Sequence, residues 1–143
     1  GRGPVAVTIR VAAAPVPPGH WLLDESLGGG RFLGEGCHFV DLLSFLAGDP
    51  EIASVQRVPL GRGGPGDGFA LQLRFADGSA GQVLYTPDAD ARLPKERIEA
   101  HAGGVTVTMW APFCSASFTS IRWRIEPTMI FDPSSSRSRM SRV

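Results

Sequence analysis

Residues 28–48 have the sequence GGGRFLGEGCHFVDLLSFLAG and contain the clearest helix pattern in the chain. After three glycines and a short charged patch, four apolar side chains recur at i, i+3, i+4 and i+7: Phe39, Leu42, Leu43 and Leu46. This spacing places them on one side of a helix. Gly34 begins the helix without a steric clash, and Gly48 ends it. We therefore predict an amphipathic helix over residues 35–47.

The segments on both sides of this helix favour strands, because their apolar residues alternate with polar ones. Strands are predicted over residues 5–11, 52–60, 69–78 and 79–87, with a further hairpin over residues 96–110. Asp77-Gly78 and Gly103-Gly104 are turn pairs that tolerate positive φ. Five or six strands with one helix predict an α+β domain.

A helix covers only one face of an open sheet of this kind. The other face must meet something, and a second sheet from another copy of the chain is a common solution. We therefore expect a homo-oligomer that forms through the uncovered sheet face.

The 143 residues are enough for one domain with a sizeable core. Fourteen basic and fourteen acidic residues give a net charge of zero, which argues against nucleic acid or an anionic membrane as a partner. Cys37 and Cys114 do not form a disulfide framework, so the cytoplasm is the expected location. Residues 1–132 are interpreted as the domain and residues 133–143, rich in serine and arginine, as a disordered tail.

One histidine and two carboxylates lie close together on the predicted helix. On a helical wheel, His38 lies at the border of the apolar stripe, where its imidazole can exchange a proton near neutral pH. Asp41, three residues on, is within reach to accept a hydrogen bond from the ring. Glu35, three residues back, lies at the positive end of the helix dipole. This pattern is compatible with a proton-transfer site and also with the ordinary start of a buried helix.

A metal site is an alternative interpretation of the same residues. Cys37 points to the opposite side of the helix and cannot join the others on one ion. Such a site would therefore need Glu35 and His38 together with a distant third ligand. The candidates for that ligand are His20 and His101.

The loop before the helix carries two further features. Trp21 is interpreted first as a core anchor for this loop and second as a wall of a ligand pocket. Gly28-Gly29-Gly30 lack the GxGxxG spacing after a strand that a phosphate-binding turn requires.

The stretch quoted above resembles the signature of the C-terminal domain in the Gfo/Idh/MocA family of NAD(P)-dependent oxidoreductases. In that family, a glycine-rich turn leads to an acidic residue, a histidine and an aspartate at the start of a helix packed on the sheet. Two more segments resemble the family: PGHWLLDESLGGGR (residues 18–31) and LPKERIEAHAGGVTV (residues 93–107). The resemblance covers roughly residues 4–108 and ends at about Met109.

The resemblance implies an open, mainly antiparallel sheet with a helix packed on one face, as in the C-terminal domain of dihydrodipicolinate reductase. By this resemblance, His38 corresponds to the catalytic histidine that exchanges a proton with the hydroxyl of a sugar-like or polyol substrate. The residues assigned to substrate binding are Glu35, Asp41, Trp21 and Arg31. The aspartate that the family usually has four residues before the histidine is Gly34 in this chain.

The resemblance also implies that NAD or NADP is bound by a separate Rossmann domain, whose fingerprint is missing from this sequence. We therefore expect the chain alone to be an inactive substrate-binding and oligomerisation domain. Two other functions remain as alternatives: a homodimerisation module without catalysis, and a metal-assisted hydrolase or lyase.

Overall fold

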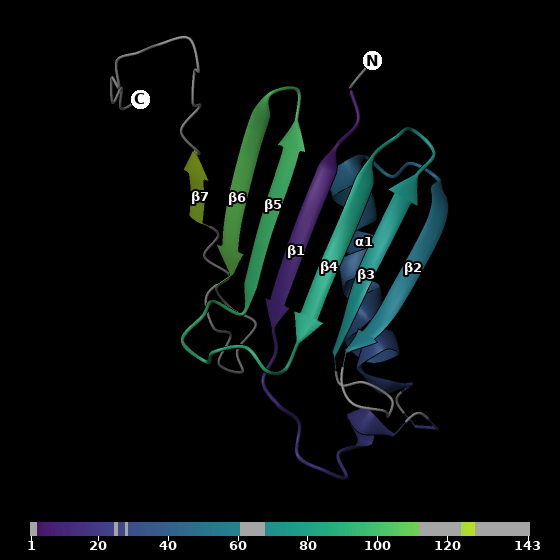
Figure 1. Cartoon of the computed structure of the whole chain (residues 1–143), viewed down its shortest axis with the longest axis vertical. Coiled ribbons are helices and arrows are strands. Elements are labelled where there is room, and N and C mark those ends of the chain that lie inside the picture. The colour runs from purple at the N-terminus through teal and green to yellow at the C-terminus, as the bar shows by residue number, and fades with distance from the viewer. Residues whose placement is uncertain (1–2, 25, 28, 61–67, 112–123, 128–143) are drawn as a thin grey trace.

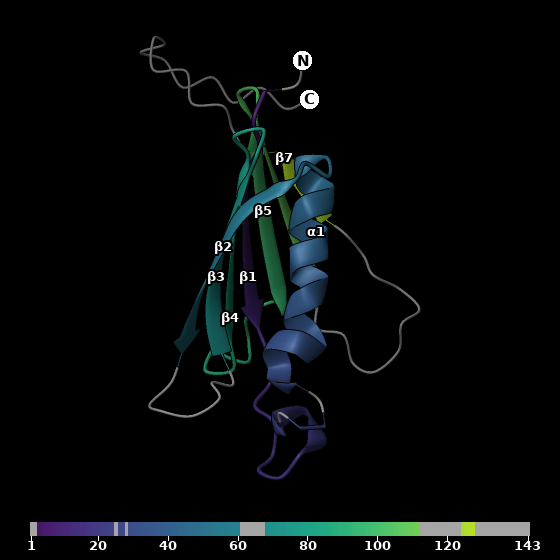
Figure 2. The same cartoon turned by 90° about the vertical axis from the view of Figure 1, so that its right-hand side faces the viewer.

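The computed structural model describes residues 3–24, 26–27, 29–60, 68–111 and 124–127. It has two layers, a twisted sheet and a helix that lies along one face of it (Figures 1 and 2). The strands are β1 (Ala6–Ala12), β2 (Ile52–Leu60), β3 (Gly68–Phe75), β4 (Ala80–Thr86), β5 (Glu96–Ala102), β6 (Val105–Ala111) and β7 (Arg124–Pro127). The helical elements are η1 (Trp21–Leu23), η2 (Phe32–Gly36) and α1 (Cys37–Ala47).

The strand order across the sheet is β2-β3-β4-β1-β5-β6-β7. β1 lies in the middle, where it pairs parallel with β4 and antiparallel with β5. The remaining pairs of described strands are antiparallel. This arrangement confirms the predicted α+β class and the open, mainly antiparallel sheet with a helix on one face.

The described part of the chain has seven strands, whereas the sequence predicts five or six. The additional strand is β7, which has four residues and pairs with β6. It lies past Met109, where the sequence no longer resembles the family, and four residues are too few for a clear period of two. The predicted tail over residues 133–143 lies outside the described residues.

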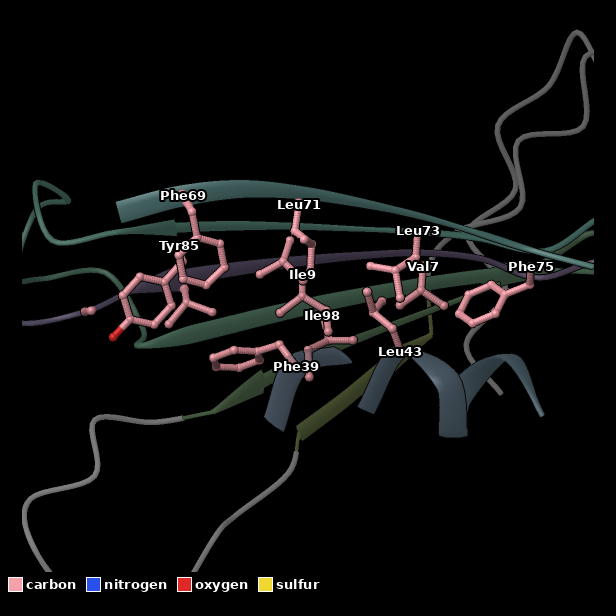
Figure 3. Close-up of a cluster of buried hydrophobic side chains, with 13 residues drawn as sticks. Val7, Ile9, Phe39, Leu43, Phe69, Leu71, Leu73, Phe75, Tyr85 and Ile98 are labelled. Atoms are coloured by element: carbon pink, nitrogen blue, oxygen red, sulfur yellow. The ribbon is translucent and has the colours of Figure 1, made fainter. Parts of the chain in front are cut away.

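A cluster of buried apolar side chains fills the space between the sheet and α1 (Figure 3). Ile9 of β1 lies between Val83 of β4 and Ile98 of β5 in the strand register, and all three are buried. Leu43 of α1, which is 0% exposed, packs onto this layer beside Gly81. The helix buries Phe39 and Leu43, as the i, i+4 pattern predicts.

The helix begins earlier than the sequence predicts. Its first turns form the π-helical segment η2, whereas the glycine pattern placed the start at Gly34. A tertiary contact explains the difference, because the Phe32 ring packs edge-on against Phe69 with centroids 5.2 Å apart. The end is as predicted: Gly48 adopts a φ of 92°, and its N–H donates to the carbonyl oxygen of Phe45.

The sheet face opposite α1, called the open face below, is largely polar. A row of side chains crosses it in register from β2 to β1: Gln56, Gln72, Gln82 and Thr8. These residues line a shallow hollow of about 740 Å³, together with Ser54 and Arg74. No helix in the described part of the chain is long and apolar enough to cross a membrane.

Candidate functional site

A buried tyrosine connects the start of the helix with the sheet. Tyr85 of β4 is 0% exposed, and its hydroxyl donates a hydrogen bond of 2.5 Å to Oε2 of Glu35. Arg31, which is 3% exposed, donates from Nη1 to the same hydroxyl at 2.8 Å. Its Nη2 donates to the carbonyl oxygen of Ala14 at 2.6 Å. Two of the predicted site residues, Arg31 and Glu35, are therefore brought together through a third side chain.

Aromatic contacts fix the orientation of the Tyr85 ring. Phe69 stacks on it with centroids 5.0 Å apart and an interplanar angle of 9°. Phe39 of α1 lies 6.1 Å away at 59°, and Tyr85 stands at one end of the buried cluster (Figure 3). The pKa of Tyr85 is raised above its ordinary value, mainly by burial and secondly by the hydrogen bond to Glu35. The hydroxyl therefore keeps its proton and acts as a donor to Glu35.

His38 and Asp41 lie on the exposed side of α1. In the part of the chain that the structure describes, neither side chain makes a hydrogen bond, so the predicted contact between Asp41 and the His38 ring is not formed. The imidazole is open to solvent one helical turn from Glu35. Its predicted role in proton transfer stays a prediction, as do the substrate-binding roles of the other site residues.

Trp21 is not a core anchor, and the first interpretation of this residue is wrong. Its side chain is 59% exposed, whereas the next residue, Leu22, is buried. His20 forms the N-cap of η1, where its Nδ1 accepts a hydrogen bond of 3.2 Å from the Leu22 N–H. The loop is therefore anchored by Leu22, and Trp21 presents its ring to solvent 5.6 Å from the His20 ring.

The metal alternative is not formed in this structure. Among the described residues, no three His, Cys, Asp or Glu side chains are placed to share an ion. His20 is engaged in the cap of η1, and Nδ1 of His101 lies 2.9 Å from Thr106 Oγ1 in the β5–β6 hairpin. Glu35 and His38 thus have no third ligand among the residues proposed for that site.

The glycine-rich turn before the helix does not fit a nicotinamide dinucleotide. Gly29 and Gly30 have positive φ values of 67° and 72°. A Cβ atom on Gly29 would lie 2.5 Å from Leu33 Cδ1, so the exposed Leu33 side chain lies directly against the turn. The described element before the turn is η1 rather than a strand, whereas the dinucleotide fingerprint follows a strand.

Tyr85 is not among the site residues predicted from the sequence, although it makes more contacts within the site than the predicted residues do. It is the only tyrosine in the chain and lies at an inward position of a strand with a period of two. Those two facts were available from the sequence. Its pairing with Glu35, fifty positions earlier in the chain, was not.

A family profile described as the GFO/IDH/MocA C-terminal domain matches residues 4–106. A comparison with curated proteins gives no match. Several solved structures have a similar fold. One is levoglucosan dehydrogenase in complex with NADH, with 22% identity, a TM-score of 0.59 and coverage of 89% of this chain and 40% of that one.

Two further solved structures have a similar fold. The WlbA dehydrogenase from Bordetella pertussis, in complex with NADH and UDP-GlcNAcA, has 23% identity and a TM-score of 0.61, covering 88% of this chain and 38% of that one. An aldose-aldose oxidoreductase from Caulobacter crescentus, complexed with glycerol, has 20% identity and a TM-score of 0.67, covering 96% of this chain and 42% of that one.

This chain spans about 40% of the length of these three structures. At these identities, the likeness shows the fold alone. The family profile goes further, because it matches well over half of the chain and includes the complete helix with its glycine-rich turn. The chain therefore belongs to the GFO/IDH/MocA C-terminal domain family.

Proposed function

We propose that the chain is the substrate-binding and oligomerisation domain of an NAD(P)-dependent oxidoreductase that acts on a hydroxyl of a sugar-like or polyol substrate. The observation that carries this proposal is the exposed His38 imidazole, one helical turn from a carboxylate that Tyr85 fixes in place. Membership of the family supports it, as do similar structures whose names refer to sugars or sugar derivatives. The cofactor would be held by a domain outside this chain.

Each residue of the site has a role in this proposal. His38 would take the proton of the reacting hydroxyl, which is the work of a general base near neutral pH. The hydride of the same carbon would pass to the oxidised nicotinamide held by the other domain. Glu35 accepts a hydrogen bond from a substrate hydroxyl. Asp41 accepts a hydrogen bond from the ring of His38 once that ring is protonated. Trp21 offers an exposed aromatic surface to the apolar face of a sugar ring.

The test uses the chain joined to the segment encoded directly before Gly1. We expect this protein to reduce NAD⁺ or NADP⁺ with a sugar or polyol as the donor. His38→Ala should lower kcat by roughly 10²–10⁴-fold, the usual contribution of a general base. Cys37→Ala is the matched control, because Cys37 is the exposed neighbour on the same helix turn. A His38→Ala variant with the rate of the unchanged protein would contradict the proposal.

The oligomerisation part of the proposal is supported by the open face. Its central strands present polar side chains around a shallow hollow, and Leu84 and Val58 are 44% and 50% exposed on β4 and β2. A second copy of the chain, related by a twofold axis, would cover this face with an identical surface. The alternative function, a homodimerisation module without catalysis, is favoured by the same face. The His38→Ala experiment separates the two functions, since only the oxidoreductase depends on His38.

A further inference from the structure

We propose that Tyr85 is a positioning residue: supported by Arg31, it fixes the Glu35 carboxylate so that its second oxygen accepts a hydrogen bond from a substrate hydroxyl beside His38. This inference rests on the proposed function and assigns a role to a residue on the sheet. It follows from the hydrogen bonds, burial and aromatic contacts that converge on one hydroxyl group.

The hydrogen bonds form a chain with one direction. The guanidinium of Arg31 has no lone pair with which to accept a hydrogen bond, so its N–H can only donate to the Tyr85 oxygen. The Tyr85 proton then points to Oε2 of Glu35. A donor that itself accepts a hydrogen bond from a cation becomes more polarised and binds its acceptor more strongly. The charge of Arg31 thus acts on Glu35 through the tyrosine.

The Glu35 carboxylate is only partly used by this chain of hydrogen bonds. Oε2 accepts from Tyr85, whereas Oε1 accepts no hydrogen bond within the described part of the chain. Glu35 is half-buried, and η2 carries it one turn before His38. A carboxylate has two oxygens and about four acceptor sites, so it can keep the Tyr85 bond and accept a second donor. A substrate hydroxyl is such a donor.

The surroundings of Tyr85 hold the direction of its hydroxyl. Phe69 and Phe39 pack against its ring, so the hydroxyl has one position relative to η2. The π-helical geometry of η2, which is rare and often found at functional sites, sets where Glu35 leaves the helix. Tyr85→Phe keeps the ring and its packing and removes only the donor. This variant therefore separates the effect of the hydrogen bond to Glu35 from the effect of ring packing.

The first arm of the test uses the 143-residue chain without substrate or cofactor. Tyr85 is its only tyrosine, so tyrosinate absorbance in the near ultraviolet reports the ionisation of this one residue. Glu35→Gln removes the acceptor charge and should lower the pH at which Tyr85 ionises. Glu51→Gln, the same change at an exposed carboxylate, should leave that pH unchanged. An unchanged ionisation of Tyr85 in Glu35→Gln overturns the inference.

The second arm measures turnover in the protein used to test the proposed function, in which the chain is joined to the segment encoded directly before Gly1. Tyr85→Phe and Glu35→Gln should each raise KM roughly tenfold, the effect of one lost hydrogen bond to a charged group, while kcat changes little. The KM of the double variant should not exceed the KM of Glu35→Gln, because Tyr85 acts through Glu35. Thr86→Val, which removes the hydroxyl of the next residue on β4, is the control and should leave KM unchanged.

Each outcome of the second arm decides whether Tyr85 positions Glu35 for the substrate. The inference is overturned if the KM increases of the two single variants multiply in the double variant. It is also overturned if Tyr85→Phe leaves KM unchanged, because Tyr85 then has a purely structural role. If no sugar or polyol is oxidised at all, the proposed function fails and the substrate role of Tyr85 fails with it. The coupling between Tyr85 and Glu35 measured in the first arm is independent of that failure, so the two failures are distinguishable.

Discussion

Leu43 of α1 packs directly onto the backbone of Gly81 in β4: a Cβ atom at position 81 would lie 2.8 Å from Leu43 Cδ2. Leu43 is 0% exposed, so its side chain has no solvent-filled space into which it can move. The absence of a side chain at Gly81 therefore sets how closely the helix approaches the sheet. His38 lies on the same helix, which makes this contact part of what positions the candidate site.

Gly81→Ala should destabilise the fold by about 1–3 kcal/mol, the usual cost of overpacking a tight core. Unfolding in urea, followed by circular dichroism, measures the change. Gly3→Ala is the matched control, since a Cβ there meets no atom within 4 Å. Equal stability of the two variants would show that the helix can move away from the sheet at little cost.

Arg31→Lys should destabilise the chain although it keeps the charge. The guanidinium reaches the Tyr85 hydroxyl and the Ala14 carbonyl with two different nitrogens, and one ammonium group cannot occupy both positions. Leaving a buried polar group unpaired costs roughly 1–3 kcal/mol. Urea unfolding of this variant, compared with Arg74→Lys at an exposed position, checks the expectation. A loss no larger than that of Arg74→Lys would contradict it.

Local features of the fold could be predicted from the sequence because neighbouring residues specify them. The strand over residues 52–60 has the predicted bounds, since alternation and flanking turn residues determine it. Gly48 ends the helix because glycine adopts its positive φ without strain. Gly103 and Gly104 form the predicted turn between β5 and β6, with φ values of 55° and 79°.

Contacts between distant segments could not be predicted in the same way. The parallel pairing of β1 with β4 joins residues 74 positions apart, as in Ala6 with Ala80, and no local period encodes it. Arg31 lies in the predicted loop before the helix, where an arginine is normally exposed. Its burial could not be predicted, because it depends on partners that are distant in the sequence. The predicted helix places His38 at the border of the apolar stripe, whereas the structure exposes it. The hydrogen bonds from Arg31 to Tyr85 and from Tyr85 to Glu35 could not be predicted from that helix either.

The stability of the chain should depend on Tyr85 at high pH. Burial and the hydrogen bond to Glu35 raise the pKa of Tyr85 in the folded state above its ordinary value of 10.0. The folded state then binds the phenolic proton more tightly than the unfolded state, so this stabilisation is complete below about pH 10 and decreases as the pH rises further. Tyr85→Phe lacks the titrating group and should not show this decrease.

The measurement is the urea midpoint of both chains between about pH 8 and about pH 11. Near pH 8, Tyr85→Phe should be less stable by roughly 1–3 kcal/mol, because Arg31 and Glu35 lose their shared partner. The gap should become smaller above about pH 10. A constant gap over the whole range would mean that the folded and unfolded states bind the Tyr85 proton equally.

Gln72→Arg should disrupt the dimer that we propose to form through the open face, and leave a monomer. Gln72 is exposed on β3 in the row that crosses the open face, between Gln56 and Gln82. A twofold axis through this face would bring the two added charges close together in the buried centre of the interface, where unpaired charges are strongly disfavoured. Light scattering over a range of protein concentrations measures the state. Ala91→Arg adds the same charge in the exposed β4–β5 connection and should leave the dimer intact. A Gln72→Arg dimer as stable as the Ala91→Arg dimer would place the contact between copies on another surface.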